Sequence, residues 1–271
     1  MRIALLGAGT IARLILHHLE RGDLPGIEVI GIAGRSLASE GAGLARQRGL
    51  PFVVDRTALL ALRPEVVVEA ASHEAVSEYL VPLLEAGVSV VVLSAGALAD
   101  DGLRASALAA AERHAARLFV PSGGIGGLDA LKAACIAGVH EVSIRIAKPP
   151  KAWRGIPYVQ RSGVDIERLD GPRTLFAGSA REGVPHFPQN VNIAAVLSLA
   201  GIGLERTRLE VVADPGLTHN THTIRVSGNS GRFTVVLENV PSPDNPKTAW
   251  LACYSALAVL RDLASRARFG T

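Results

Sequence analysis

The chain has 271 residues, of which 48% are hydrophobic and 20% are charged, and its formal net charge is +3. This composition suits a globular protein of one compact body or two subdomains, and it excludes an intrinsically disordered chain. We expect a cytoplasmic protein without a membrane partner, because no apolar run reaches the roughly 18 residues of a span and the N-terminus lacks the zones of a signal peptide. The basic residues are scattered and lack interleaved aromatic residues, so no nucleic-acid partner is expected.

A short apolar strand at residues 2–6 runs directly into a glycine-rich turn. Residues 7–12 read Gly-Ala-Gly-Thr-Ile-Ala, which fits the pattern G-x-G-x-x-A, and a helix is expected over 12–19. Gly7 allows a tight turn and Gly9 lets the backbone approach a pyrophosphate at the start of the helix. The predicted cofactor-binding residues of this turn are Gly7, Gly9, Thr10 and Ile11. The alternative is a glycine turn in an unrelated α/β unit.

Strand and helix patterns then alternate through the first half of the chain. Short apolar strands are expected at residues 27–33, 52–54, 66–69, 88–93 and 118–120. Ala and Leu at helical spacing predict helices at residues 36–48, 73–86 and 101–117. Right-handed crossovers between such elements give a Rossmann-type, doubly wound parallel sheet.

The end of the second expected strand bears on which dinucleotide binds. Sheets that prefer NAD usually carry an Asp or Glu there for the ribose 2′-hydroxyl, whereas this chain has Arg35 and Ser36. A cation and a hydroxyl can hold a 2′-phosphate, so the sequence favours NADP(H), with NAD(H) accepted alongside. The alternative for Arg35 is a solvated surface residue.

From residue 121 onwards the pattern changes. A glycine cluster at 122–127 marks a junction, and a helix is expected directly after it at 128–137. The remaining elements alternate like antiparallel strands, at residues 141–147, 173–176, 209–212, 221–226 and 233–238. One helix at 189–199 interrupts them, and a last helix starts at Asn245-Pro246 and runs to about Leu263.

We therefore expect an α/β protein with two domains. Residues 1–122 form the dinucleotide-binding domain, completed by a C-terminal helix within 246–271. Residues 123–245 form a second α/β domain of mostly antiparallel sheet, for substrate binding and oligomerisation. Cys135 and Cys253 lie in apolar helical stretches without metal-ligand spacing, which predicts reduced thiols and no metal site.

Motifs spread over nearly the whole chain resemble the L-aspartate dehydrogenase family. They are Ser-Gly-Gly-Ile-Gly-Gly-Leu-Asp-Ala-Leu at 122–131, Lys-Pro-Pro at 148–150, Phe-Pro-Gln-Asn-Val-Asn at 187–192, Asn-Thr-His at 220–222 and Asn-Pro-Lys-Thr at 245–248. The resemblance implies an oxidoreductase that uses NAD or NADP to deaminate L-aspartate oxidatively to iminosuccinate, which hydrolyses to oxaloacetate and ammonia. It also implies the reverse amination, a homodimer or larger homo-oligomer, and a place in amino-acid metabolism and pyridine nucleotide biosynthesis.

The resemblance also implies roles for particular residues. The catalytic histidine of the family falls on His222, and a cofactor-contacting asparagine falls on Asn192. A second cofactor contact falls on Gly124, where the family has an alanine. Thr223 stands where an acidic side chain is expected, so the surroundings of the histidine differ from the family pattern.

The chemistry points to the same histidine. Oxidation of an amine by hydride transfer requires a neutral amine, so a base with a pKa near the working pH should lie beside the reacting bond. His222 is the choice, either as this base or as the group that orients the hydrolytic water. Its alternative role is a hydrogen-bonded histidine at the start of a strand.

A dicarboxylate substrate needs cations and oriented donors. Lys148, at the end of a strand, can pair with one carboxylate, and Lys247 can serve the other. Asn190, in the first turn of its helix, adds an amide donor. Surface solvation for the lysines and helix capping for the asparagine are the alternatives. Two other functions stay open: an NAD(P)-dependent oxidoreductase of another small acid, and a non-catalytic nucleotide-binding regulator.

Overall fold

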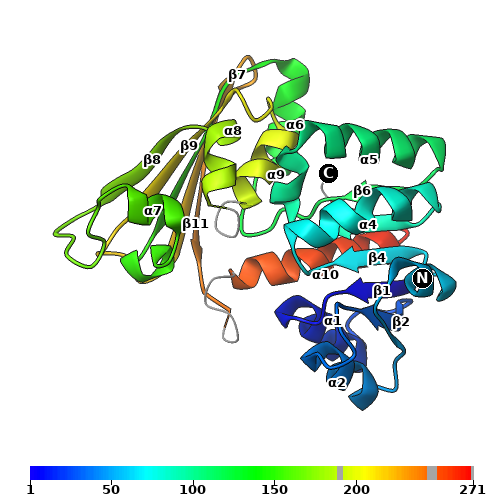
Figure 1. Cartoon of the computed structure of the whole chain (residues 1–271). Coiled ribbons are helices and arrows are strands. Elements are labelled where there is room, and N and C mark those ends of the chain that lie inside the picture. The colour runs from blue at the N-terminus through cyan, green and yellow to red at the C-terminus, as the bar shows by residue number, and fades with distance from the viewer. Residues whose placement is uncertain (188–191, 243–248, 270–271) are drawn as a thin grey trace. The chain divides into compact units, whose positions relative to one another are not determined.

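A computed structural model describes residues 1–187, 192–242 and 249–269, and its elements are shown along the chain in Figure 1. The chain divides into two compact units. The first comprises Met1–Pro121 and Cys253–Phe269, and the second comprises Ser122–Ala252. Each unit has its own β-sheet.

The sheet of the first unit contains six parallel strands in the order β3-β2-β1-β4-β5-β6. The strands are β1 (Arg2–Leu6), β2 (Glu28–Ala33), β3 (Phe52–Val53), β4 (Val66–Glu69), β5 (Ser89–Val92) and β6 (Leu118–Phe119). All four residues of β4 are buried, as expected for a strand covered on both faces. This strand order is that of the Rossmann fold, so the predicted fold class is confirmed.

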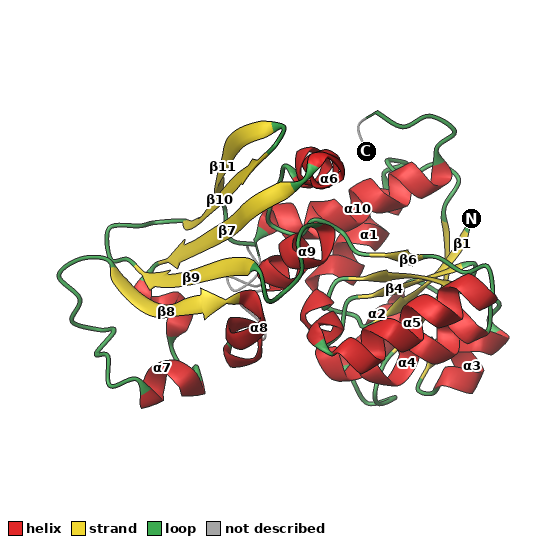
Figure 2. Cartoon of the chain, turned by 90° about the horizontal axis from the view of Figure 1, so that it is seen from above, coloured by secondary structure: helices red, strands yellow, loops and turns green. Residues whose placement is uncertain are grey.

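Helices of this unit follow the strands in alternation. They are α1 (Thr10–Glu20), α2 (Glu40–Gln47), α3 (Arg56–Ala61), α4 (His73–Glu85), the 3₁₀ helix η1 (Ala95–Ala99), α5 (Asp101–Arg113) and α10 (Trp250–Ala264), which belongs to this unit from Cys253 onwards. Helices α4 and α5 pack side by side over β4, β5 and β6 (Figure 2).

Two of these helices differ from the expected bounds for local reasons. The helix expected at 36–48 begins only at Glu40, because the Ser39 N–H bonds to the Ser36 carbonyl in a preceding turn. The helix expected at 101–117 ends at Arg113, and Ala115 has a positive φ of 53° that no helix can contain. Helix α3 was not expected; Asp55 caps it by accepting a hydrogen bond from the Ala58 N–H.

The sheet of the second unit has five strands in the order β11-β10-β7-β9-β8. They are β7 (Val139–Lys148), β8 (Arg173–Ser179), β9 (Thr207–Ala213), β10 (Asn220–Gly228) and β11 (Gly231–Asn239). Only the β7–β9 pair is parallel, so the expected mostly antiparallel sheet is confirmed. Helices α6 (Leu128–Ala137) and α9 (Asn192–Ala200) pack on one face of it (Figure 2).

The prediction of a single helix between these strands was wrong. Further short helices occur: η2 (Pro150–Trp153), α7 (Pro157–Arg161), α8 (Ala180–Gly183) and η3 (Val184–His186). Helix α8 begins with a capping box of Ser179 and Glu182, a spacing that is visible in the sequence. The expected starts of the helices at 189 and 245 lie outside the described residues. Ala249 forms a β-bridge with Pro241, so α10 begins after it, at Trp250.

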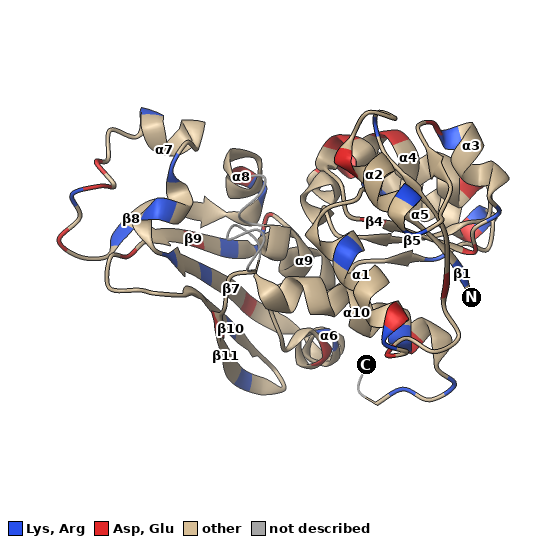
Figure 3. Ribbon diagram, turned by 90° about the horizontal axis from the view of Figure 1, so that it is seen from below, with Lys and Arg blue, Asp and Glu red and all other residues tan. Residues whose placement is uncertain are grey.

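Over the described ranges, no helix is long and apolar enough to cross a membrane. In the same ranges, no group of three or more His, Cys, Asp or Glu side chains could hold a metal ion. Cys135 and Cys253 are free thiols, as expected, although only Cys253 is fully buried. Charged residues of both signs are distributed over both units (Figure 3).

Candidate active site

The glycine turn of the first unit has the geometry of a phosphate cradle. Gly7 has a φ of +104°, and a Cβ there would lie 2.7 Å from the carbonyl oxygen of Ala70. Gly9 is the N-cap of α1 with no side-chain cap, and a Cβ there would have open space around it. Packing therefore demands a glycine at position 7, whereas at position 9 the turn leaves room and free helix N–H groups for an anion.

The other predicted nucleotide residues lie in the same unit at the carboxyl ends of β1 and β2. Thr10 and Ile11 are half-buried in the first turn of α1. Arg35 and Ser36 are exposed just after β2, and the Ser36 Oγ accepts a hydrogen bond from the Ala38 N–H. A hydrogen bond from Ser72 is the main cause that lowers the pKa of the Glu74 carboxyl, and the charge of Arg35 helps to lower it. The contact of Arg35 with a 2′-phosphate stays a prediction.

A buried carboxylate at the end of β4 ties together two loops beside this turn. Glu69 is 1% exposed, and its Oε1 accepts from the Ala71 N–H and the Ser94 hydroxyl, at 2.8 and 2.9 Å. Its Oε2 accepts from the N–H groups of Leu93 and Ser94, at 3.2 and 2.9 Å. Four donors therefore satisfy the two oxygens of this buried carboxyl group, and the loops after β4 and β5 are fixed to each other.

Changing Glu69 to Gln is expected to lower the free energy of unfolding by about 2 kcal/mol, the cost of leaving buried donors unpaired. Both carboxylate oxygens accept from two donors, so the new amide NH₂ must face another donor in either orientation. Urea denaturation measures the change. Asp100→Asn is the matched control, because Asp100 accepts a single N–H, from Leu103, and an amide oxygen can still do so. An equal loss in both variants would contradict this account.

Buried polar side chains gather at one end of the second sheet. Lys148 ends β7, His222 lies on β10, and Asn239 ends β11; they are 4%, 3% and 4% exposed. Along each strand, alternate side chains point to the sheet face that α6 and α9 cover. All three residues are in phase with those side chains, so they share that face. Asn220, which pairs with Asn239 across the strands, is buried beside them.

Hydrogen bonds fix the histidine ring to the glycine cluster. The His222 Nδ1 lies 3.0 Å from the carbonyl oxygen of Gly124, and the Asn239 Nδ2 donates to the same oxygen at 3.0 Å. The His222 Nε2 is buried and has no hydrogen-bond partner among the described residues. A buried nitrogen without a partner costs free energy, so its retention points to a ligand that supplies one.

Burial sets the charges of this cluster. Burial, with the positive charge of Lys148, lowers the pKa of His222 to about 4, although the Gly124 carbonyl opposes the shift. Burial also lowers the pKa of Lys148 to about 8, and its ammonium lies 5.2 Å from the centre of the Trp153 ring. At neutral pH the site therefore combines a neutral imidazole with a cation. This pair suits an anionic substrate that must lose a proton. The structure does not show the expected base with a pKa near the working pH; the negative charge of a bound dicarboxylate favours the imidazolium and raises this pKa.

The structure brings together three of the residues predicted for this unit, namely His222, Gly124 and Lys148. Asn192 is the half-buried first residue of α9. Asn190 and Lys247 lie outside the described residues. Asn239 was not predicted, but the sequence contains a signal for it. Alternate residues of this strand, Phe233, Val235 and Leu237, are apolar, and Asn239 is a polar residue at the next such position.

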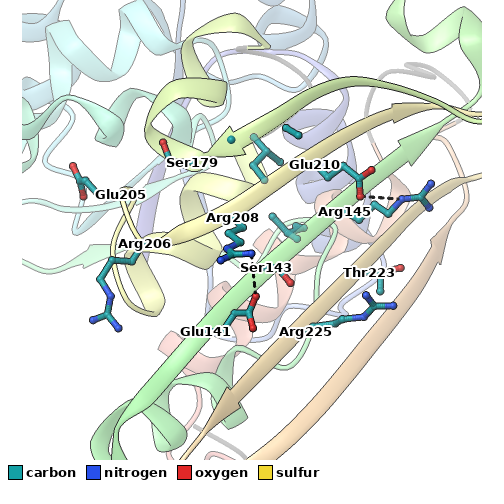
Figure 4. A pocket seen from close by; sticks show the side chains of 14 residues that line it. Glu141, Ser143, Arg145, Ser179, Glu205, Arg206, Arg208, Glu210, Thr223 and Arg225 are labelled. Atoms are coloured by element: carbon teal, nitrogen blue, oxygen red, sulfur yellow. Dashed lines mark ion pairs between the residues drawn. The ribbon is translucent and has the colours of Figure 1, made fainter.

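A groove of about 670 Å³ lies on the opposite face of the second sheet and is not this site. Its strands contribute alternating residues such as Ser143 and Thr223, which point away from the face of His222. Arg145 pairs with Glu210 at 3.3 Å, and Arg208 lies 3.7 Å from Glu141 (Figure 4). These half-buried or exposed ion pairs occupy the groove, and none of the described residues that line it is a buried base.

Comparisons with known proteins agree with the architecture of both units. A family model described as the NAD-binding domain of homoserine dehydrogenase matches residues 7–121, and one described as the C-terminal part of aspartate dehydrogenase matches residues 129–263. The chain is 40% identical to the L-aspartate dehydrogenase of Methanosarcina mazei over 273 residues, with 100% of both chains covered. It is 42% identical to L-aspartate dehydrogenase 2 of Bordetella pertussis, with 99% of each covered.

Solved structures extend this likeness to the fold. The aspartate dehydrogenase of Thermotoga maritima is 31% identical, with a TM-score of 0.78, and the match covers 100% of this chain and 99% of that one. A hyperthermophilic archaeal homoserine dehydrogenase in complex with NADPH shares the fold at 15% identity and a TM-score of 0.56. The motif resemblance is thereby confirmed, and the chain belongs to the L-aspartate dehydrogenase family.

Proposed function

We propose that this protein catalyses the NAD(P)-dependent oxidative deamination of L-aspartate to iminosuccinate, and the reverse reductive amination. The observation that carries the proposal is the buried, unpartnered Nε2 of a neutral His222 beside the cation of Lys148. Iminosuccinate then hydrolyses to oxaloacetate and ammonia. Membership in the L-aspartate dehydrogenase family supports the choice of substrate.

The side chains have separate tasks in this proposal. The ammonium of Lys148 binds one carboxylate of aspartate by a charge-assisted hydrogen bond. The Nε2 of His222 takes the proton of the substrate ammonium, so that the neutral amine can be oxidised, while the Gly124 carbonyl holds the other ring nitrogen. Bound NAD(P)⁺ supplies the hydride acceptor. The imidazolium then releases this proton to solvent, so that the same Nε2 can accept a proton from the water that attacks the imine.

The cofactor is proposed to lie on the glycine turn of the first unit. Its predicted contacts are Gly7, Gly9, Thr10, Ile11, Arg35 and Ser36, with Gly124 and Asn192 from the second unit. The Gly124 carbonyl already accepts from Asn239 and lies 3.0 Å from the His222 Nδ1, so we assign a cofactor contact there to the Gly124 N–H. Asn190 and Lys247 are proposed as further carboxylate-binding residues.

Initial rates with oxaloacetate and ammonia test the function directly. NADH or NADPH should be consumed, and pyruvate, glyoxylate or 2-oxoglutarate in place of oxaloacetate should give much lower kcat/KM. Faster turnover of one of these acids would support an oxidoreductase with another substrate. Nucleotide binding without turnover of any of them would support a regulator.

Changing Arg35 to Glu is expected to raise the KM for NADPH by about 30-fold, because a cation that can pair with the 2′-phosphate becomes a carboxylate that repels it. The KM for NADH should stay within about threefold, since its 2′-hydroxyl can donate to a carboxylate. Parallel titrations of both nucleotides in the oxaloacetate assay measure the two constants. Equal changes in both would show that Arg35 does not face the 2′ position.

We also propose a cytoplasmic homodimer or larger homo-oligomer, with a place in amino-acid metabolism and pyridine nucleotide biosynthesis. Family membership supports the assembly. Residues 1–122 and 246–271 are proposed as the dinucleotide-binding domain, and 123–245 as the substrate domain. Sedimentation equilibrium tests the oligomeric state.

A further inference from the structure

Two buried nitrogens, the His222 Nδ1 and the Asn239 Nδ2, converge on the single carbonyl oxygen of Gly124, and only one of them comes from the proposed base. We infer that Asn239 is a positioning residue, which holds the Gly124 carbonyl so that it keeps the proton of neutral His222 on Nδ1 and leaves Nε2 unprotonated. The inference rests on the proposed function for its consequence in catalysis. Its structural content concerns one tautomer and can be tested without turnover.

The contacts define the arrangement closely. The Asn239 Nδ2 and the His222 Nδ1 each lie 3.0 Å from the Gly124 oxygen, and they are 3.1 Å from each other. A carbonyl oxygen has two lone pairs and can accept from both. The amide of Asn239 must present its NH₂ to this oxygen, because its own oxygen would otherwise face another acceptor in a buried setting.

The Gly124 carbonyl lies in a glycine-rich segment, in which side chains restrict the backbone little. Gly123 and Gly127 both have positive φ values, of 66° and 76°, and residue 124 carries no side chain to restrict its peptide. A Cβ at Gly124 would lie 3.6 Å from the His222 Cε1 and 3.7 Å from the Asn239 Nδ2. The backbone of Gly124 thus packs directly against the side chains of His222 and Asn239. Rotation of its carbonyl would break the contact with the histidine.

The same contacts select the tautomer. With the proton on Nδ1, His222 donates to Gly124, and the Nε2 lone pair is ready to accept a proton from a substrate ammonium. With the proton on Nε2, the Nδ1 lone pair would face the Gly124 oxygen at 3.0 Å, and a buried N–H at Nε2 would have no acceptor among the described residues. In that second tautomer, Asn239 could donate to Nδ1. The two forms therefore differ in which ring nitrogen carries the proton, which an experiment can measure.

Nitrogen-15 NMR of histidine-labelled protein decides between them. Long-range proton–nitrogen correlations separate a protonated ring nitrogen from an unprotonated one, and a His222→Asn variant assigns the signals among the eight histidines. We expect a protonated Nδ1 in the wild type at pH 7, and a mixture of both tautomers in Asn239→Leu. A protonated Nε2 in the wild type, or an unchanged spectrum in Asn239→Leu, would overturn the inference.

Kinetics provide a second readout. In Asn239→Leu, kcat for aspartate oxidation should fall by about tenfold while the KM for the nucleotide stays constant, as for the partner of an oriented imidazole. In Asn239→Asp, a carboxylate beside the ring favours the imidazolium, so the acid limb of kcat/KM should move to higher pH. Asp is nearly isosteric with Asn, so this variant keeps the test available if Asn239→Leu does not fold.

Asn229 offers a matched control in the same unit. Its Nδ2 donates to the Ala137 carbonyl at 2.8 Å, far along the sheet from His222, so Asn229→Ala should leave the histidine spectrum and the pH profile unchanged. An equal fall in kcat in both variants would reduce Asn239 to a general structural role. If the wild type shows no turnover of oxaloacetate and ammonia, the proposed function fails, whereas the spectrum still tests the tautomer.

Discussion

Replacement of His222 by Asn is expected to lower kcat for L-aspartate oxidation by about 10³-fold, within the range that a positioned general base supplies. The amide of Asn fills a similar volume but cannot take up a proton at neutral pH. The KM for NADPH should change by less than about threefold, because the substitution acts on the chemical step. Steady-state rates in both reaction directions and nucleotide binding by fluorescence measure the two effects.

A second histidine of the same unit serves as the control. His219 is exposed and its Nδ1 lies 2.9 Å from the Thr218 hydroxyl, so His219→Asn should keep wild-type rates. If His222→Asn retains more than about a tenth of the wild-type kcat, the proton acceptor lies elsewhere. A fall only in the hydrolysis of the imine would assign His222 to the water instead.

The parts of the fold that could be predicted are those in which local pattern and tertiary packing agree. β1, β4 and α6 have the expected bounds, because each combines one clear periodicity with a glycine turn or polar residues at its ends. α7 and α8 were missed because helices of five and four residues are too short for a periodic signal. Helix α8 nevertheless has the capping-box spacing, which pattern reading alone did not use.

The site was predictable where a residue type carries the chemistry. His222 and Lys148 stood out as a base and a cation at strand ends in motifs of the family. Asn239 did not, because an asparagine just after an apolar strand is also typical of a turn. Its importance comes from the pairing of β10 with β11, which places it beside a histidine 17 residues earlier. Sequence alone does not fix that register.

Changing Lys148 to Met is expected to raise the KM for aspartate by about 10²-fold, because removing one partner of a buried charge pair costs several kcal/mol. Met keeps the length of the side chain and its contact with the Trp153 ring. Thermal unfolding and steady-state rates together separate lost binding from lost folding.

Binding of a dicarboxylate should weaken as the pH rises, because it depends on the positive charge of Lys148. The pKa of Lys148 is lowered to about 8, so its cationic form prevails below that pH and is lost above it. The inhibition constant of succinate, which has no group that titrates between about pH 7 and pH 10, should therefore rise about tenfold per pH unit above pH 8. In Lys148→Met, succinate should bind weakly, and its inhibition constant should not change with pH over the same range. His222 titrates near pH 4 and cannot produce this limb, so a flat wild-type profile would remove Lys148 from the carboxylate site.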